Sequence, residues 1–309
     1  MKTPPPEDLT YTEHASDIIA KAAVLINAGR PFALITSLAI EGGAAREVGS
    51  LALVESNGAM TGYLSNGCID RDIQLHAQAA LECGKKILIR YGEGSRYVDL
   101  KLPCGGALTV LIDPAPDHKA ILTAAQDLAA RHPVRLTFSA EDMSKAFDYS
   151  PRERLVLAGR GAVFRSIAQI GWATGFELHL LSPDPEDLAA IGHLASSRPV
   201  HLTTPDQVPE LTTLDAFSAF LTLFHDHGWE PDLLHAAVNS PAAFIGSLGS
   251  QRTHKMRLDT LRAMGVDEAK LTRLRGPIGL VPSLRNAPSI AVSALAEVVA
   301  ALQQTNRYV

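Results

Sequence analysis

Two cysteines in glycine-rich turns are the residues of this chain best suited to chemistry. Cys68 lies in the run Ser-Asn-Gly-Cys-Ile-Asp at residues 65–70, and Cys104 lies in Leu-Pro-Cys-Gly-Gly at residues 102–106. Because glycine has no side chain, the glycines beside each sulfur let a bulky ligand approach the main chain and the thiol. The alternative is that Cys68 is a small apolar residue that fills a tight turn. The sequence leaves both interpretations open.

The residues after Cys68 predict a helix over residues 69–83. A thiol at a helix N-terminus lies in a positive field that favours the thiolate, which is the form that binds metals and attacks sulfur. Cys83, at the end of the same helix, has no such setting and is expected to be structural.

A second glycine-rich loop, at residues 246–252, follows a predicted strand and opens a helix. Its free N–H groups are expected to face the carboxyl edge of a sheet, where an anion binds favourably. Arg252 is available to pair with a phosphate, although a glycine turn with a solvated arginine is the alternative. The loop residues expected to contact a ligand are Gly246, Gly249, Ser250 and Arg252.

The run Phe-His-Asp-His at residues 224–227 follows a predicted strand at residues 217–222. Ligands of open α/β sheets bind at this edge, so His225 and Asp226 are candidates to contact or position one. Histidines two residues apart do not match the spacing of a zinc site on a helix, and histidines in a polar loop are often only solvated.

Residues 155–181 read as strand, glycine loop, helix and strand, which is the opening unit of a Rossmann-like domain. Gly159 and Gly161 supply the turn, but Phe164 stands where a dinucleotide fingerprint needs a third small residue. We expect Phe164 to push the helix away from the strand or to fill the ribose space. NAD(P) binding is therefore expected to be high-micromolar at best.

The order of predicted elements gives an α/β chain of three parts. An N-terminal mixed α/β domain covers residues 1–113, a connecting segment covers residues 114–153, and a Rossmann-like domain with a doubly wound parallel sheet covers residues 154–309.

Composition excludes several classes of function. The net charge is −5 and there is no basic run, which disfavours nucleic acid and acidic membrane surfaces as partners. No apolar stretch approaches the ~20 residues that span a bilayer, and the first residues do not form a signal peptide. Three cysteines in 309 residues favour a reducing compartment, so we expect a cytoplasmic protein.

Together these motifs resemble the XdhC/CoxI family, the accessory proteins that mature xanthine dehydrogenase and related molybdenum hydroxylases. The matching runs keep their order along the chain. They are Gly49-Ser50, residues 65–70, residues 102–106, residues 159–164, His225-Asp226, residues 244–252 and residues 277–280. The chain departs from the family pattern at Asn66, Asp70 and Phe164, and in the final turn at residues 287–291.

The resemblance implies a carrier of the molybdenum cofactor (molybdopterin) rather than an enzyme. Such a protein protects the cofactor while a cysteine desulfurase supplies the terminal sulfur, and then passes it to an apo-hydroxylase; we also expect a homodimer. The soft metal–dithiolene head suits two thiolates, so Cys68 and Cys104 are the expected molybdenum ligands and should lie near each other across one cleft. The other residues expected to contact the cofactor are Asn66, Gly67, Gly105, Gly106, Gly159, Gly161, His225, Asp226 and the phosphate-loop residues Gly246, Gly249, Ser250 and Arg252.

Two alternatives come from other classes of protein. One is an NAD(P)-dependent oxidoreductase built on the Rossmann-like domain, and the other is a purely structural adaptor. Only a molybdenum cofactor carrier should be purified with pterin and molybdenum bound.

Overall fold

The computed structural model describes residues 9–10, 12–43, 45–65, 67, 69–92, 106–140, 143–209 and 213–306. By contacts within the chain, it divides into two compact units, residues 1–151 and residues 152–309.

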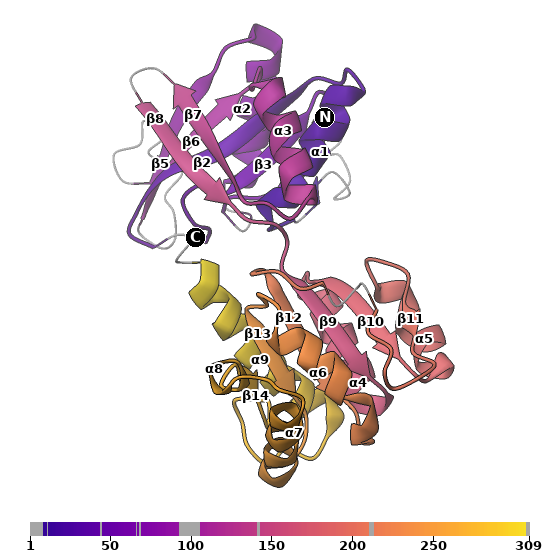
Figure 1. Ribbon diagram of the computed structural model, residues 1–309. Coiled ribbons are helices and arrows are strands. Elements are labelled where there is room, and N and C mark those ends of the chain that lie inside the picture. Colours follow the sequence, from indigo (N-terminus) through magenta and orange to yellow (C-terminus); the bar gives the residue numbers. More distant parts are fainter. Residues whose placement is uncertain are drawn as a thin grey trace. The chain divides into compact units, whose positions relative to one another are not determined.

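The first unit is built on a mostly antiparallel sheet (Figure 1). Its elements in chain order are β1 (Leu9–Thr10), α1 (Ala15–Asn27), β2 (Phe32–Glu41), β3 (Leu51–Glu55), β4 (Met60–Gly62), α2 (Asp70–Cys83), β5 (Ile87–Gly92), β6 (Ala107–Asp113), α3 (His118–Ala129), β7 (Val134–Ala140) and β8 (Met143–Tyr149). The strand order is β1-β4-β3-β2-β6-β5, and only the β1–β4 pair is parallel.

The sheet of the first unit has a core on each face. Successive side chains of a strand point to opposite faces. Leu34 of β2 therefore packs in the core that contains α1 and α3, whereas Ile35 packs in the core that contains α2. Helix α2, whose first turn follows the Cys68 run, is held against the sheet by this second core.

Residues 114–151 of the predicted connecting segment belong to the first unit. Helix α3 contributes Ile121 to the same core as α1, and β7 and β8 pair as a hairpin that adds Phe138 and Tyr149. The sequence indicated a connecting segment here, whereas the structure has a helix and a two-stranded hairpin. The β8 strand buries little beyond its last residue, so no alternating apolar pattern marked it.

The second unit is a parallel sheet with helices on both faces (Figure 1). Its elements are β9 (Arg154–Gly159), α4 (Gly161–Ala173), β10 (Glu177–Ser182), α5 (Pro185–Ile191), η2 (Gly192–Leu194), β11 (Val200–His201), β12 (Ser218–Leu223), η4 (His227–Trp229), α6 (Pro231–Val238), β13 (Phe244–Ser247), α7 (Gln251–Ala263), α8 (Glu268–Leu271), β14 (Leu274–Arg275) and α9 (Ala287–Asn306). The strand order is β11-β10-β9-β12-β13-β14, which confirms the predicted Rossmann-like, doubly wound architecture.

The strand order of this sheet reverses between β9 and β12. From β9 the chain runs outward through β10 and β11, and then returns to β12 on the other side of β9. Helices α4 and α9 pack on one face, and α6 and α7 pack on the other. Open α/β sheets bind ligands at such a switch point, beyond the carboxyl ends of the strands. Among the helices of the described residues, none has the length and hydropathy needed to cross a membrane.

Candidate functional site

The predicted ligand residues of the second unit gather at one edge of the sheet. Gly159 ends β9, His225 and Asp226 follow β12, and the glycine-rich run at residues 246–252 begins in the last residues of β13 and continues beyond it. Because these three strands are parallel neighbours, their carboxyl ends lie side by side. The structure therefore brings together loops that are far apart in the sequence.

The N-terminus of α4, where a dinucleotide phosphate would bind, holds a carboxylate of the chain itself. The N–H of Gly161 donates to Oδ2 of Asp187 at 2.6 Å, and Arg165 pairs with the other oxygen of the same carboxylate. Asp187 is only 1% exposed. A buried carboxylate at this position uses the donor and the positive field that a phosphate would otherwise take.

The glycine loop before α4 is explained largely by packing. A Cβ on Gly159 would lie 2.6 Å from the Cβ of Leu223, so the close approach of β12 requires glycine there. Gly161 has a φ of +82°, which favours glycine, and the space beside it is open.

Phe164 does not occupy the ribose space. It is fully buried in the hydrophobic core shared with α9. The helix nevertheless approaches the first strand closely, because a Cβ on Gly171 would lie 2.7 Å from Leu155. Phe164 therefore neither pushes the helix away from the strand nor fills the ribose space. Its ring lies in the core, and the close helix–strand contact is made two turns later, at Gly171.

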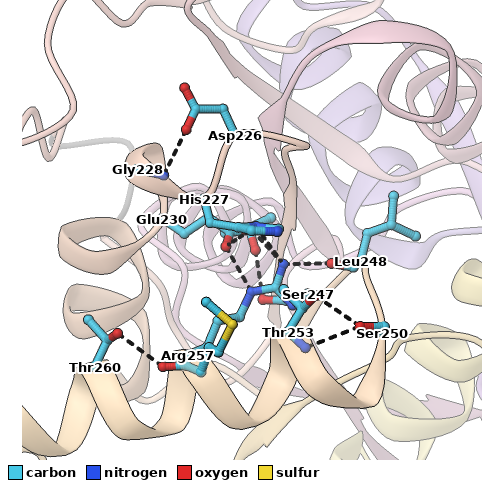
Figure 2. Close-up of polar contacts among 12 residues, drawn as sticks. Asp226, His227, Gly228, Glu230, Ser247, Leu248, Ser250, Thr253, Arg257 and Thr260 are labelled. Carbon is cyan, nitrogen blue, oxygen red and sulfur yellow. Dashed lines mark hydrogen bonds and ion pairs between the residues drawn. The ribbon is translucent and has the colours of Figure 1, made fainter.

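A buried arginine forms the centre of the polar network at the carboxyl ends of β12 and β13 (Figure 2). Arg257 of α7 donates through Nε and Nη2 to the two carboxylate oxygens of Glu230, both at 2.8 Å. Nη2 also donates to the carbonyl oxygen of Leu248 at 2.6 Å and lies 3.4 Å from Nδ1 of His227. The same His227 nitrogen lies 3.0 Å from Glu230. Arg257 is 5% exposed and Glu230 is 1% exposed.

One guanidinium nitrogen of this network is left over. Nη1 of Arg257 is buried and has no hydrogen-bond partner among the described residues. It lies beneath the turn that opens α7, since a Cβ on Gly249 would be 3.2 Å from it. Buried charged donors without an acceptor are rare in folded proteins and point to a missing partner.

Three of the predicted ligand residues, Gly249, Ser250 and Arg252, lie at the start of α7. Ser250 caps the helix by accepting a hydrogen bond from the N–H of Thr253 at 3.1 Å. Arg252 is exposed, and Gly249 has a φ of +147° that disfavours any side chain. Gly246, by contrast, is required by packing, because a Cβ there would lie 2.5 Å from Ile278.

In the loop after β12, the candidate residues His225 and Asp226 and the neighbouring His227 have different surroundings. His225 and Asp226 are exposed, and the Asp226 carboxylate accepts a hydrogen bond from the N–H of Gly228 while pointing away from the arginine network (Figure 2). His227 joins the network instead. Within the described residues, no three His, Cys, Asp or Glu side chains are placed to hold a metal ion.

The turn around Cys68 in the first unit is braced by Asp70. Its carboxylate accepts from the N–H groups of Leu64 at 2.8 Å, Ser65 at 3.2 Å and Gly67 at 2.7 Å, and from Oγ of Ser65 at 2.9 Å. Asp70 is 2% exposed. Gly67 has a φ of +100°, which favours glycine, and the space beside it is open.

Several predicted ligand residues of the first unit lie outside the described residues. They are Asn66, Cys68, Cys104 and Gly105, so the predicted closeness of the two sulfurs stays a prediction. Gly106 is described, and a Cβ there would collide with the carbonyl oxygen of Gly43 and lie 2.6 Å from that of Glu41. Packing of the main chain accounts for this glycine without any ligand.

Sequence reasoning missed Asp187, Glu230 and Arg257 as site residues. Arg257 lies in a polar stretch of α7, but it is four residues before Leu261, the other buried residue of that helix. Residues four apart lie on the same face of a helix, so this spacing could have indicated from the sequence that Arg257 is buried.

Comparison with known proteins gives consistent results over both units. Residues 25–92 match the model of the XdhC and CoxI family, and residues 155–298 match the model of the XdhC Rossmann domain. The chain is 29% identical to the molybdenum cofactor insertion chaperone PaoD of Escherichia coli, over 95% of this chain and 90% of that protein. It is 25% identical to the uncharacterized protein YqeB of Escherichia coli, over 92% of this chain but only 46% of that longer protein.

A solved structure shares the fold. A protein from Bacillus halodurans, described as a xanthine dehydrogenase, superimposes with a TM-score of 0.74 at 19% identity, covering 93% of this chain and 96% of the other. The two family models, the likeness to PaoD along nearly the whole length, and the motifs around both cysteines agree. The chain belongs to the XdhC/CoxI family.

Proposed function

We propose that this chain is an insertion chaperone that delivers the molybdenum cofactor to a molybdenum hydroxylase. The observation that carries the proposal is the 29% identity to PaoD over 95% of the chain, which spans both units. A carrier needs a firm cradle more than it needs catalytic groups. Leu64, Ser65 and Gly67, which together make four hydrogen bonds to the buried carboxylate of Asp70, would give the cargo such a rigid support.

The residues of the first unit suit the metal end of this cargo. Thiolates are the protein ligands preferred by soft metal centres, so we assign Cys68 and Cys104 to the molybdenum. The main chain at Asn66, Gly67 and Gly105 is assigned to the same end. Asp70 acts through the turn, because it orders the N–H groups on either side of residue 66 without itself touching the cargo.

The finer parts of the proposal concern partners. An apo-hydroxylase receives the cofactor, and a cysteine desulfurase supplies the terminal sulfur while the cofactor is held. We also propose that the chain acts as a homodimer in the cytoplasm.

The geometry of the second unit speaks against the alternative of an NAD(P)-dependent oxidoreductase. A dinucleotide bound in the usual way places its pyrophosphate on the N-terminus of the helix after the first strand. Asp187 holds that position through Gly161 and Arg165. Bringing a pyrophosphate against this buried carboxylate would add like-charge repulsion to the loss of both contacts.

Purification from a host that makes molybdopterin tests the function. We expect the chain to carry molybdenum and releasable pterin fluorescence, and to transfer activity to an apo-hydroxylase in a reconstitution assay. Cys68→Ser and Cys104→Ser should each lower the retained molybdenum at least tenfold with unchanged circular dichroism. Cys83→Ser is the matched control, because Cys83 is an exposed free thiol at the end of α2. A chain that carries NAD(P) and no pterin would contradict the proposal.

A further inference from the structure

We propose that the N-terminus of α7 is an oxyanion site for a phosphate monoester, supported from below by the buried guanidinium of Arg257. The ligand would lie on the turn at residues 249–252, with Arg252 at its solvent side. That this phosphate belongs to the molybdenum cofactor rests on the proposed function. The anion site itself does not.

The first step of the argument is the unused hydrogen-bonding capacity of the turn. The N–H of Leu248 donates to Thr222, and that of Thr253 donates to the capping Ser250. Between them, the N–H groups of Gly249, Ser250, Gln251 and Arg252 have no acceptor in the described part of the chain. Successive free N–H groups at a helix N-terminus, which also carries the positive end of the helix dipole, are what an oxyanion uses.

The second step is the buried cation. Burying an arginine is unfavourable unless its charge is paired and its donors are satisfied. Glu230 pairs with Nε and Nη2 of Arg257 in a two-pronged contact and fixes the plane of the guanidinium. Nη1 is then left without an acceptor, directly beneath Gly249. Because Glu230 balances the charge of Arg257, what Nη1 offers to an anion held by the turn above it is a buried, unused hydrogen-bond donor.

The third step is the role of Gly249. Its φ of +147° turns the main chain, and a Cβ there would lie 3.2 Å from Nη1 and 3.4 Å from Thr253. Any side chain would therefore be both strained and wedged between the guanidinium and the turn. Glycine at this place keeps the charge of Arg257 within reach of the surface.

The N-terminus of α4 makes a comparison within the same sheet edge. There the first N–H, that of Gly161, is already occupied by Asp187, and the nearby Arg165 is paired with the same carboxylate. At α7 no carboxylate takes the N–H groups in the described residues, and the acid of the network, Glu230, accepts from Nε and Nη2 of Arg257 instead. One helix end carries its own anion, and the other is equipped to receive one.

The site is tested with inorganic phosphate as the probe. Phosphate is titrated into the full chain, freed of cargo, at constant ionic strength, while the backbone amide signals of residues 249–252 and 161–163 are followed by NMR. We expect saturable shifts at residues 249–252 and none beyond the bulk salt effect at residues 161–163. Arg252→Ala should weaken binding about tenfold, as for the loss of one charge-assisted hydrogen bond.

Arg160→Ala is the matched control, because Arg160 is an exposed arginine at the start of α4. It should change the affinity less than twofold. The double variant Glu230→Gln/Arg257→Gln removes the guanidinium and its free Nη1 donor without leaving a buried carboxylate unpaired, and it should weaken phosphate binding at least tenfold. Should this variant fail to fold, Arg252→Ala against Arg160→Ala decides the matter.

The proposal is overturned if residues 249–252 show no saturable shift, if Arg252→Ala binds phosphate like the parent, or if Arg160→Ala weakens binding as much as Arg252→Ala does. Cofactor retention is measured separately on the same variants. Phosphate binding at α7 without any bound pterin would leave this site standing and reject the proposed function. Bound pterin without phosphate binding at α7 would do the reverse.

Discussion

Replacing Asp70 by asparagine should loosen the turn that carries Cys68. The change keeps the shape of the side chain but removes the charge and one acceptor oxygen. If Oδ1 keeps its bonds to Leu64 and Ser65, the new amide faces the N–H of Gly67 and the hydroxyl of Ser65 in place of Oδ2. The Ser65 hydroxyl can accept from the amide, whereas the Gly67 N–H is left facing another donor.

The size of the effect follows from these bonds. A hydrogen bond to a charged group contributes about 1.5–3 kcal/mol, and a donor left unsatisfied costs about 1–3 kcal/mol. Because Asp70 is 2% exposed, water cannot replace the lost acceptor. We therefore expect Asp70→Asn to lower the free energy of unfolding of the first unit by about 2–4 kcal/mol. With a urea dependence of ~2 kcal/mol per molar, the unfolding midpoint falls by roughly 1–2 M.

The two units can be followed by different chromophores. Both tryptophans of the chain, Trp172 and Trp229, lie in the second unit. Tyrosine near-ultraviolet dichroism of the first unit should therefore shift in urea while tryptophan fluorescence stays unchanged. Asp117→Asn is the matched control, since Asp117 is an exposed N-cap of α3 and asparagine caps equally well.

Cofactor retention separates a positioning role from simple stability. At urea-free conditions, where both variants stay folded, Asp70→Asn should retain at least tenfold less molybdenum and Asp117→Asn should retain the parental amount. A first-unit transition within about 0.5 kcal/mol of the parent would refute the view that this carboxylate holds the turn.

Two further predictions concern the second unit. Asp187→Ala should lower the free energy of unfolding of this unit by about 2–3 kcal/mol, because the N–H of Gly161 loses its acceptor. Added sulfate should recover part of that loss and should stabilise the parent less. Equal sulfate effects on both proteins would count against an anion position at α4. Burial, together with the charge of Arg257, lowers the pKa of His254 below its usual value. The folded unit therefore binds this proton more weakly than the unfolded chain, so stability should fall as the pH drops through about 6.5 and level off below the folded pKa. Thermal melts followed by tryptophan fluorescence between pH 7 and 5 should show this fall, and His254→Asn should flatten it.

The architecture followed from the sequence because its signals are local. Apolar runs bounded by glycine and proline marked most strands, and the alternation of strands with helices after residue 154 was enough for a parallel sheet. Strand β8 escaped because its apolar face is short, with Lys145 and Asp148 among its few residues. Periodicity identifies an element through the face it buries, and β8 buries little.

The polar network around Arg257 could not be predicted from the sequence for a different reason. Glu230 and Arg257 are 27 residues apart. Glu230 immediately precedes α6, where the sequence reads as an ordinary helix start, and Arg257 lies in a polar stretch of α7. Their pairing is a product of the packing of α6 against α7, which no spacing rule contains. The same holds for Asp187, which reaches Gly161 from the following helix.

The glycines show how far a motif can be trusted. From sequence, each glycine near a predicted ligand was assigned to the ligand, yet packing alone requires Gly106, Gly159 and Gly246. Gly67 is different, because its φ is positive and the space beside it is open. Gly249 is different again. A side chain there would lie against Nη1 of the buried Arg257, so glycine leaves this nitrogen next to the turn with the free N–H groups. A glycine is therefore compatible with a binding site when the space beside it is open or when a polar atom next to it lacks a hydrogen-bond partner. Open space alone is not sufficient, because Gly161 also has a positive φ and open space beside it, yet its N–H already donates to Asp187.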